Sequence, residues 1–215
     1  MRSKWFAPIV IGVMLLFSAV LYAQLPNRIP IHFGINGSAD QYGDKWYAVL
    51  LMPGISLLVW ALLLALPSID PKREFYKVGI GTYWLVVNLI VLFLGVIHFV
   101  MLGIAAGWNI SITQVICIAI GLLFVLLGNQ FPRIQPNWFM GIRTPWTLSD
   151  EEVWKRTHRL GGRVFVIAGI ILALAGIIAP GPLALVVMIG VLTITVLIPV
   201  VYSYRTWRQL HPEHV

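Results

Sequence analysis

Few side chains in this sequence have a type and a position suited to chemistry, and one small group of them lies in its first half. His32, Asp40 and Tyr42 fall within one polar stretch, and His98 lies in an apolar stretch further along the chain. Two histidines and a carboxylate are ligands that zinc accepts, but their spacing does not impose a site, and we predict no metal. His98 could be a neutral histidine bonded to the backbone or to interfacial water, or it could pair with His32 or Asp40. These four residues are the candidates for sensing on one face of the protein.

A second group lies in the central segment, which we define as residues 128–163 and which combines many charges with many aromatic residues. Arg143 has a planar guanidinium that suits bidentate contact with a lipid phosphate or with Glu151 or Glu152. Its alternative role is to anchor the segment at a membrane interface, together with Trp138 and Trp146. The candidates for docking a partner are Asn129, Asn137, Arg143, Thr144, Pro145, Trp146, Trp154, His158 and Arg159. Because the chain has no G-x-S-x-G, H-E-x-x-H or phosphate-binding glycine loop, we predict neither an enzyme nor a cofactor.

A helix is predicted to begin in the middle of the central segment. Ser149 and Glu152 match the S-x-x-E capping box, in which the serine oxygen accepts a hydrogen bond from the amide of Glu152. Gly161 and Gly162 should weaken this helix. Apolar residues fall on one face and basic residues largely on the others, which predicts one amphipathic helix lying on the cytoplasmic membrane surface.

The central segment also resembles the signature segment of the SdpI family, which are bacterial membrane immunity proteins against a secreted toxin peptide. The resemblance is carried by Gly128-Asn129, Pro132, Pro136-Asn137, the run from Gly141 to Leu148, Trp154, and the run from Thr157 to Gly162. More loosely, Leu25 to Pro30 followed by His32-Phe33 is similar to a domain of unknown function often found ahead of that signature. The resemblance implies protection from a toxin peptide on the outer face and, as in the best-known system, recruitment of a cytoplasmic repressor.

The composition indicates an integral membrane protein. Hydrophobic residues make up 59% of the 215 residues and charged residues 11%, whereas about one quarter of a soluble domain is charged. The net charge of +7 could suggest nucleic acid. Because the basic residues lie between apolar runs and are not clustered on one folded face, we predict no direct nucleic-acid binding.

Six uncharged apolar stretches predict an all-α protein with six transmembrane helices, multi-pass in the cell membrane. The stretches are Trp5 to Leu25, Tyr47 to Leu66, Val78 to Gly103, Ile110 to Leu127, Val164 to Ala179, and Leu183 to Tyr204. Of the 15 lysines and arginines, all except Arg28 and Lys45 fall on one side of these spans. The positive-inside rule therefore predicts that both termini and the central segment are cytoplasmic.

A single membrane domain, residues 1–215, is expected. Residues 1–109 form a three-span half with an outer loop, residues 26–46, and residues 110–215 form the SdpI-like half. In the outer loop, Ile29 to Ile35 reads as an extended run, Asn36-Gly37 as a turn, and Gln41 to Lys45 as the return to the membrane. In the second half, Gly162, Gly169 and Gly176 recur every seven residues, a spacing that predicts close contact between two helices.

The function predicted on these grounds is immunity, with a toxin peptide outside, a repressor inside, and membrane lipids as partners. A membrane enzyme or lipid-handling protein that uses Arg143 and His158 on a phosphate-bearing headgroup is the alternative. A small-molecule transporter is disfavoured, because such proteins place ionisable groups near the bilayer midplane and the predicted spans hold only His98.

Overall fold

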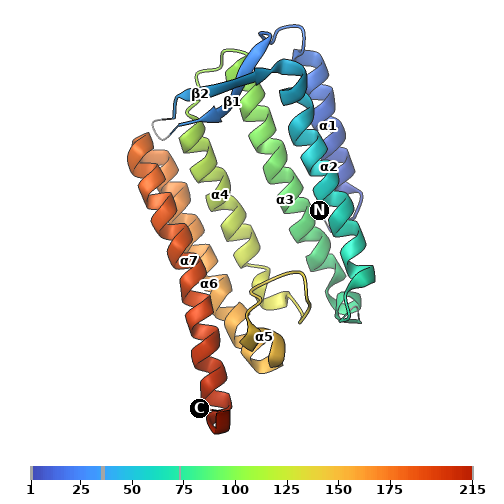
Figure 1. The fold of residues 1–215 in the computed structure, drawn as a ribbon, viewed down its shortest axis with the longest axis vertical. Coiled ribbons are helices and arrows are strands. Elements are labelled where there is room, and N and C mark those ends of the chain that lie inside the picture. The colour runs from blue at the N-terminus through green and yellow to red at the C-terminus, as the bar shows by residue number, and fades with distance from the viewer. Residues whose placement is uncertain (1, 35–36, 73, 215) are drawn as a thin grey trace.

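Long helices stand side by side in this protein, and a two-stranded hairpin lies over one end of them (Figure 1). The computed structural model of the chain describes residues 2–34, 37–72 and 74–214. We call the end covered by the strands the hairpin end. The opposite end holds the turn between α2 and α3, the short helix α5 and the C-terminus (Figure 1), and we call it the basic end.

The long helices form two groups that follow the two halves of the chain. The first group is α1 (Phe6–Leu21), α2 (Lys45–Ile69) and α3 (Glu74–Ala105). The second is α4 (Ile112–Gly128), α6 (Glu151–Ile178) and α7 (Gly181–Leu210). Helices pack against one another within each group, and α3 also contacts α4, so the two groups meet along these two helices.

Five of the described helices, α2, α3, α4, α6 and α7, are long and apolar enough to cross a membrane. The first predicted span, Trp5 to Leu25, corresponds to α1, which has only 16 residues and ends at Leu21. At about 1.5 Å per residue this helix is about 24 Å long, which is shorter than the hydrocarbon core of about 30 Å. The chain is thus a helical, multi-pass protein of the cell membrane, and its described residues include five helices long enough to cross the membrane and one shorter apolar helix.

The predicted glycine seam is confirmed, and its partner is α4. A Cβ atom added to Gly128 would lie 2.7 Å from the backbone oxygen of Gly162, and one added to Gly121 would lie 2.6 Å from that of Gly169. A Cβ on Gly176 would lie 2.8 Å from the oxygen of Gln114. Only glycine lets the two backbones approach this closely, and this contact holds the second group together.

The outer loop forms the predicted hairpin from β1 (Arg28–Phe33) and β2 (Ala39–Asp44), which pair antiparallel. Ile29 in β1 is buried and packs with Leu25, Val49 and Leu102, which fastens the hairpin to α2 and α3. The predicted end of the first run at Ile35 and the predicted turn residue Asn36 lie outside the described residues.

The central segment differs from its prediction in two ways. The residue that caps α6 is Asp150, whose Oδ1 accepts from the amide of Val153 at 2.9 Å, and Ser149 is instead the last residue of α5 (Pro145–Ser149). The predicted separate surface helix is also wrong, because α6 continues without a break from Glu151 through Gly161-Gly162 into the membrane span. Both glycines are buried in this helix. The short 3-10 helices η1 (Phe131–Arg133) and η2 (Pro212–His214) complete the chain.

Candidate functional site

His158 is the centre of the packed layer at the basic end. Its Nε2 accepts a hydrogen bond from the amide of Ile142 at 3.0 Å, and its Nδ1–H donates to the backbone oxygen of Trp154 at 2.9 Å. The ring is buried and stacks on the indole of Trp154 with ring centroids 4.0 Å apart. The indole Nε1–H of Trp154 in turn donates to the oxygen of Ile134 at 2.9 Å. Each ring nitrogen of His158 therefore already has a partner, one of them a donor and the other an acceptor. The neutral side chain joins α6 to the loop that contains Ile142.

Gly141, directly before Ile142, lets the loop approach the ring of His158. Gly141 has φ +107°, and a Cβ atom there would collide with the ring of His158. Three residues later Thr144 caps α5, accepting from the amide of Thr147, while the side chain of Thr147 accepts from the Thr144 amide. The hydroxyl of Thr144 also donates to Ser203 Oγ on α7 at 3.0 Å. The loop is therefore bound to both α6 and α7.

Asp70, at the C-terminal end of α2, is a buried site residue that the sequence reasoning missed. Its carboxylate accepts from the amide of Lys72 at 2.8 Å, the hydroxyl of Tyr76 at 2.9 Å and the amide of Trp138 at 3.0 Å. Burial, followed by the hydrogen bond and charge of Asp70, raises the pKa of Tyr76, so its hydroxyl stays a donor. The signal in the sequence was a carboxylate shortly after an apolar span, on the side that carries most of the lysines and arginines.

Asn137, in the second half of the chain, joins the hydrogen bonds that Asp70 and Tyr76 make in the first half. Its Oδ1 accepts from the amides of Phe139 and Met140 at 2.9 and 2.6 Å, and its Nδ2 donates to the oxygen of Gln135 at 2.9 Å. The same Oδ1 lies 3.3 Å from the hydroxyl of Tyr76. The α2–α3 turn and the central segment therefore share one polar network.

The docking candidates divide into two sets by exposure. Asn137, Thr144, Trp154 and His158 are buried and bonded within the protein. The set that can meet a partner consists of Asn129, Arg143, Pro145 and Arg159, which are exposed, with Trp146 half-buried against Tyr204. Arg143 donates to the backbone oxygen of Trp138 at 2.8 Å, which orients its guanidinium along the loop.

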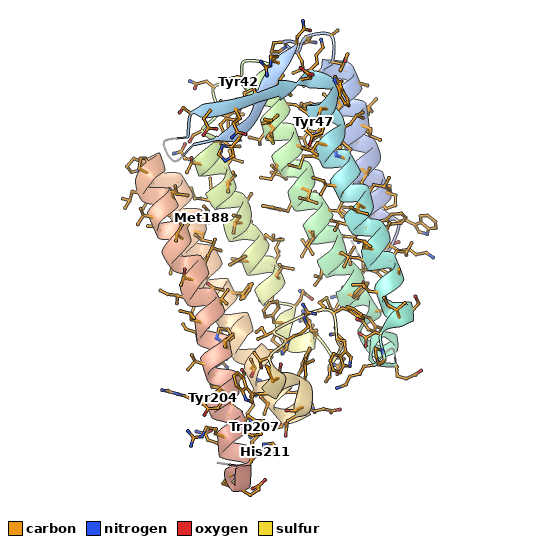
Figure 2. All side chains as sticks on the ribbon, viewed as in Figure 1. Tyr42, Tyr47, Met188, Tyr204, Trp207 and His211 are labelled. Carbon is orange, nitrogen blue, oxygen red and sulfur yellow. The ribbon has the colours of Figure 1, made fainter. Side chains whose placement is uncertain are left out.

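At the hairpin end, two of the sensing candidates lie together. His32 Nδ1 and Asp40 Oδ1 are 2.6 Å apart across the hairpin, and both side chains are about half exposed. They line the rim of a hollow of about 640 Å³ whose other walls are Phe33, Gly34 and apolar side chains of α4 and α7, among them Ile116, Leu185 and Met188. Figure 2 shows Met188 on α7, in the part of the helix nearer the hairpin. We call this hollow the outer pocket.

The other two sensing candidates lie apart from that rim. Tyr42 is exposed on β2, and its backbone oxygen accepts from the guanidinium of Arg28 at 3.1 Å. His98 is buried in α3, where its Nε2 lies 2.8 Å from Ser18 Oγ on α1. His98 therefore contacts a side-chain hydroxyl of α1 and not His32 or Asp40. Among the described residues, no three His, Cys, Asp or Glu side chains lie close enough together to hold a metal ion.

Comparison with known families identifies the segment that builds the basic end. Residues 133–203 match the sequence model of the SdpI/YfhL protein family. The match spans the second part of the central segment, α5, α6 and most of α7, and it confirms the resemblance stated from the sequence. Residues 9–57, which include most of α1, the hairpin and the first part of α2, match a domain of unknown function (DUF1648).

Two relatives give the extent of the similarity. The chain is 26% identical over 211 residues to the "Immunity protein SdpI" of Bacillus subtilis (strain 168), and the match covers 98% of this chain and 99% of that protein. It is also 30% identical over 61 residues to an uncharacterized protein of Archaeoglobus fulgidus, covering 28% of this chain and 33% of that one. No solved structure matches the chain.

Proposed function

We propose that this protein is a membrane immunity protein that protects a bacterium from a secreted toxin peptide. The observation that carries the proposal is the similarity to the immunity protein of Bacillus subtilis over 98% of this chain. Because the match covers both halves, it includes the hairpin and the basic end as well as the helices between them. The protein acts in this proposal by binding, without a chemical step.

The outer pocket is where we place the encounter with the toxin. Its apolar walls suit an apolar segment of a peptide, and the rim formed by His32 and Asp40 supplies hydrogen-bonding groups that fix orientation. The two halves of the chain both contribute, since the rim comes from the hairpin and the walls from α4 and α7. The positive-inside bias supports placing this pocket on the outer face of the membrane.

A second, finer part of the proposal concerns the basic end. We place the docking surface for a cytoplasmic repressor on the exposed side chains of the central segment, chiefly Arg143, Pro145 and the half-buried Trp146. The buried residues Asn137, Thr144 and His158 support this surface by fixing the loop that carries it. A fixed loop loses little conformational entropy when it binds, which favours a docking role.

The alternative of an enzyme acting on phosphate-bearing headgroups depends on His158, and its surroundings do not favour that role. A general acid or base must reach the proton that it transfers. His158 is 1% exposed and bonded through both ring nitrogens to Ile142 and Trp154. We therefore keep immunity as the proposed function.

Expression in a bacterium sensitive to the toxin tests this proposal. Cells that make the intact protein should survive toxin concentrations that kill cells with an empty vector. The matched control is Gly169→Leu, which places a side chain in the α4–α6 contact and so should prevent folding. Equal killing of cells that make correctly inserted wild-type protein and cells that carry the empty vector would contradict the function.

A further inference from the structure

Two hollows flank a pair of arginines on α6 at the basic end. The first, of about 420 Å³, lies between α6 and α7 and is lined by Glu152, Lys155, Arg156, Arg159, Leu160, Arg163 and Tyr202. The second, of about 430 Å³, lies between α6 and the end of α4 and includes Gly128, Asn129, Gly162 and the same two arginines. Arg159 and Arg163 are one helical turn apart, so both can reach one ligand placed on this face.

The charge of this face is strongly positive and largely uncompensated. The one acidic residue that lines the first hollow, Glu152, pairs with Arg156 at 2.6 Å. Among the described residues, neither Arg159 nor Arg163 forms an ion pair. The face therefore attracts an anion, and two guanidinium forks suit the oxygens of a phosphate.

The position of the pair along α6 places it at the boundary of the bilayer. Between Arg159 and the opposite end of the helix at Ile178 there are 19 steps, which at about 1.5 Å each make about 28 Å, close to the hydrocarbon thickness. Arg163 lies one turn closer to the membrane centre and is exposed on the helix surface. A charge at this depth gains from contact with a phosphate group, since headgroups lie just beyond the hydrocarbon.

The same helix face turns apolar immediately below the arginines. Ile167, Ile170 and Leu174 are 60%, 49% and 52% exposed, so they face the lipid. Val166 and Ile167 also form the floor of the second hollow. A ligand bound here contacts the arginines at one end and apolar side chains at the other. A phospholipid has a phosphate and acyl chains in this order, whereas a free phosphate ion has no apolar part.

We propose that Arg159 and Arg163 hold the phosphate of an anionic phospholipid at the basic end, with its acyl chains lying over Val166 and Ile167. Lys155 and Tyr202, in the first hollow, contact the rest of the headgroup. Basic pockets at the ends of spanning helices are known binding places for acidic headgroups. This site is separate from the outer pocket and does not depend on the immunity function. It also assigns Arg159 to lipid and leaves the docking surface to Arg143 and its neighbours.

The test is native mass spectrometry of the purified full chain in detergent, titrated with phosphatidylglycerol or with phosphatidylcholine of the same acyl chains. We expect the wild-type protein to retain one phosphatidylglycerol in preference to phosphatidylcholine. Replacing both arginines, Arg159→Gln with Arg163→Gln, should raise the Kd for phosphatidylglycerol about 30-fold. The control, Arg205→Gln with Arg208→Gln, removes the same charge at the same end but outside both hollows, and should change the Kd less than about threefold.

Several outcomes would overturn the site. If the wild-type protein shows no preference for phosphatidylglycerol, or if the control pair weakens it as much as the test pair, the arginines attract anions only through diffuse charge. If inorganic phosphate displaces the lipid at equal concentration, the ligand is a soluble phosphate. Since the wild-type comparison needs no variant, the proposal can be overturned even if the glutamine pair does not fold.

Discussion

Asp70 shows how much a single buried side chain contributes at the basic end. Three donors converge on its carboxylate, from Lys72, Tyr76 and Trp138, and the last of these belongs to the other half of the chain. Asp70→Ala leaves all three without this acceptor, and each unpaired buried donor costs about 1–3 kcal/mol. We expect a loss of about 2–4 kcal/mol in the free energy of unfolding, measured by thermal unfolding in detergent. The control is Glu151→Ala, an exposed carboxylate, and equal losses for the two variants would contradict the role of Asp70.

Gly141 gives a second prediction at the residue scale. At φ +107° any side chain is strained, and a Cβ atom would also meet the ring of His158. Gly141→Ala should therefore destabilise the protein by about 2–3 kcal/mol in the same unfolding measurement. Gly190→Ala on α7, where no atom lies within 4 Å of an added Cβ, is the matched control and should be neutral or slightly stabilising. A tolerated alanine at position 141 would mean that the turn does not rest on His158.

At the scale of elements, the start of α6 can be tested directly. Asp150→Ala removes the oxygen that accepts from Val153 and should cost about 1 kcal/mol. Ser149→Ala should cost less than about 0.5 kcal/mol. The serine hydroxyl is exposed and donates to the backbone oxygen of Trp146 in α5, so its loss removes no bond to α6. Hydrogen exchange of the first-turn amides of α6 measures both. If Ser149→Ala speeds exchange more than Asp150→Ala does, Ser149 caps α6 as the sequence predicted.

The sequence pattern failed at this element for a physical reason. Ser149 and Glu152 have the spacing of a capping box, but the serine is already part of α5, which Thr144 caps and which begins with Pro145 at the position that proline favours. Two capping motifs lie next to each other in this stretch, and the structure contains only the one at Thr144. Gly161 and Gly162 did not end the helix, because close packing on η1 and α4 outweighs their weak helix propensity.

At the scale of the whole molecule, orientation is the first question. With buried Cys117 replaced by serine, Ser38→Cys at the hairpin end should react with a membrane-impermeant thiol reagent in intact cells. Ser149→Cys at the basic end should react only after the cells are opened. Labelling of Ser149→Cys alone in intact cells would reverse the assignment of the outer pocket and of the docking surface.

Much of the architecture follows from the sequence, whereas the sites follow only in part. The apolar stretches predict the long helices, and the glycine spacing predicts that α6 packs closely against another helix, because both depend on local patterns. That this helix is α4 is decided only when the chain folds. The outer pocket could not be predicted, since it forms only when the hairpin of the first half folds over Leu185 and Met188 of the second. The burial of Trp154 and His158 likewise depends on a loop that is distant in space until the chain folds.

Survival against the toxin, measured for variants of each end at equal membrane abundance, tests most directly where the toxin is met. We expect His32→Ala, Asp40→Asn and the pocket-filling Leu185→Trp to lower survival. Arg143→Lys and Trp146→Phe should leave survival unchanged and weaken only the capture of a cytoplasmic partner. Arg143→Lys keeps the charge but loses the bidentate fork, so it separates a specific contact from simple anchoring. If the variants at the hairpin end leave survival intact and those at the basic end abolish it, the outer pocket is not where the toxin is met.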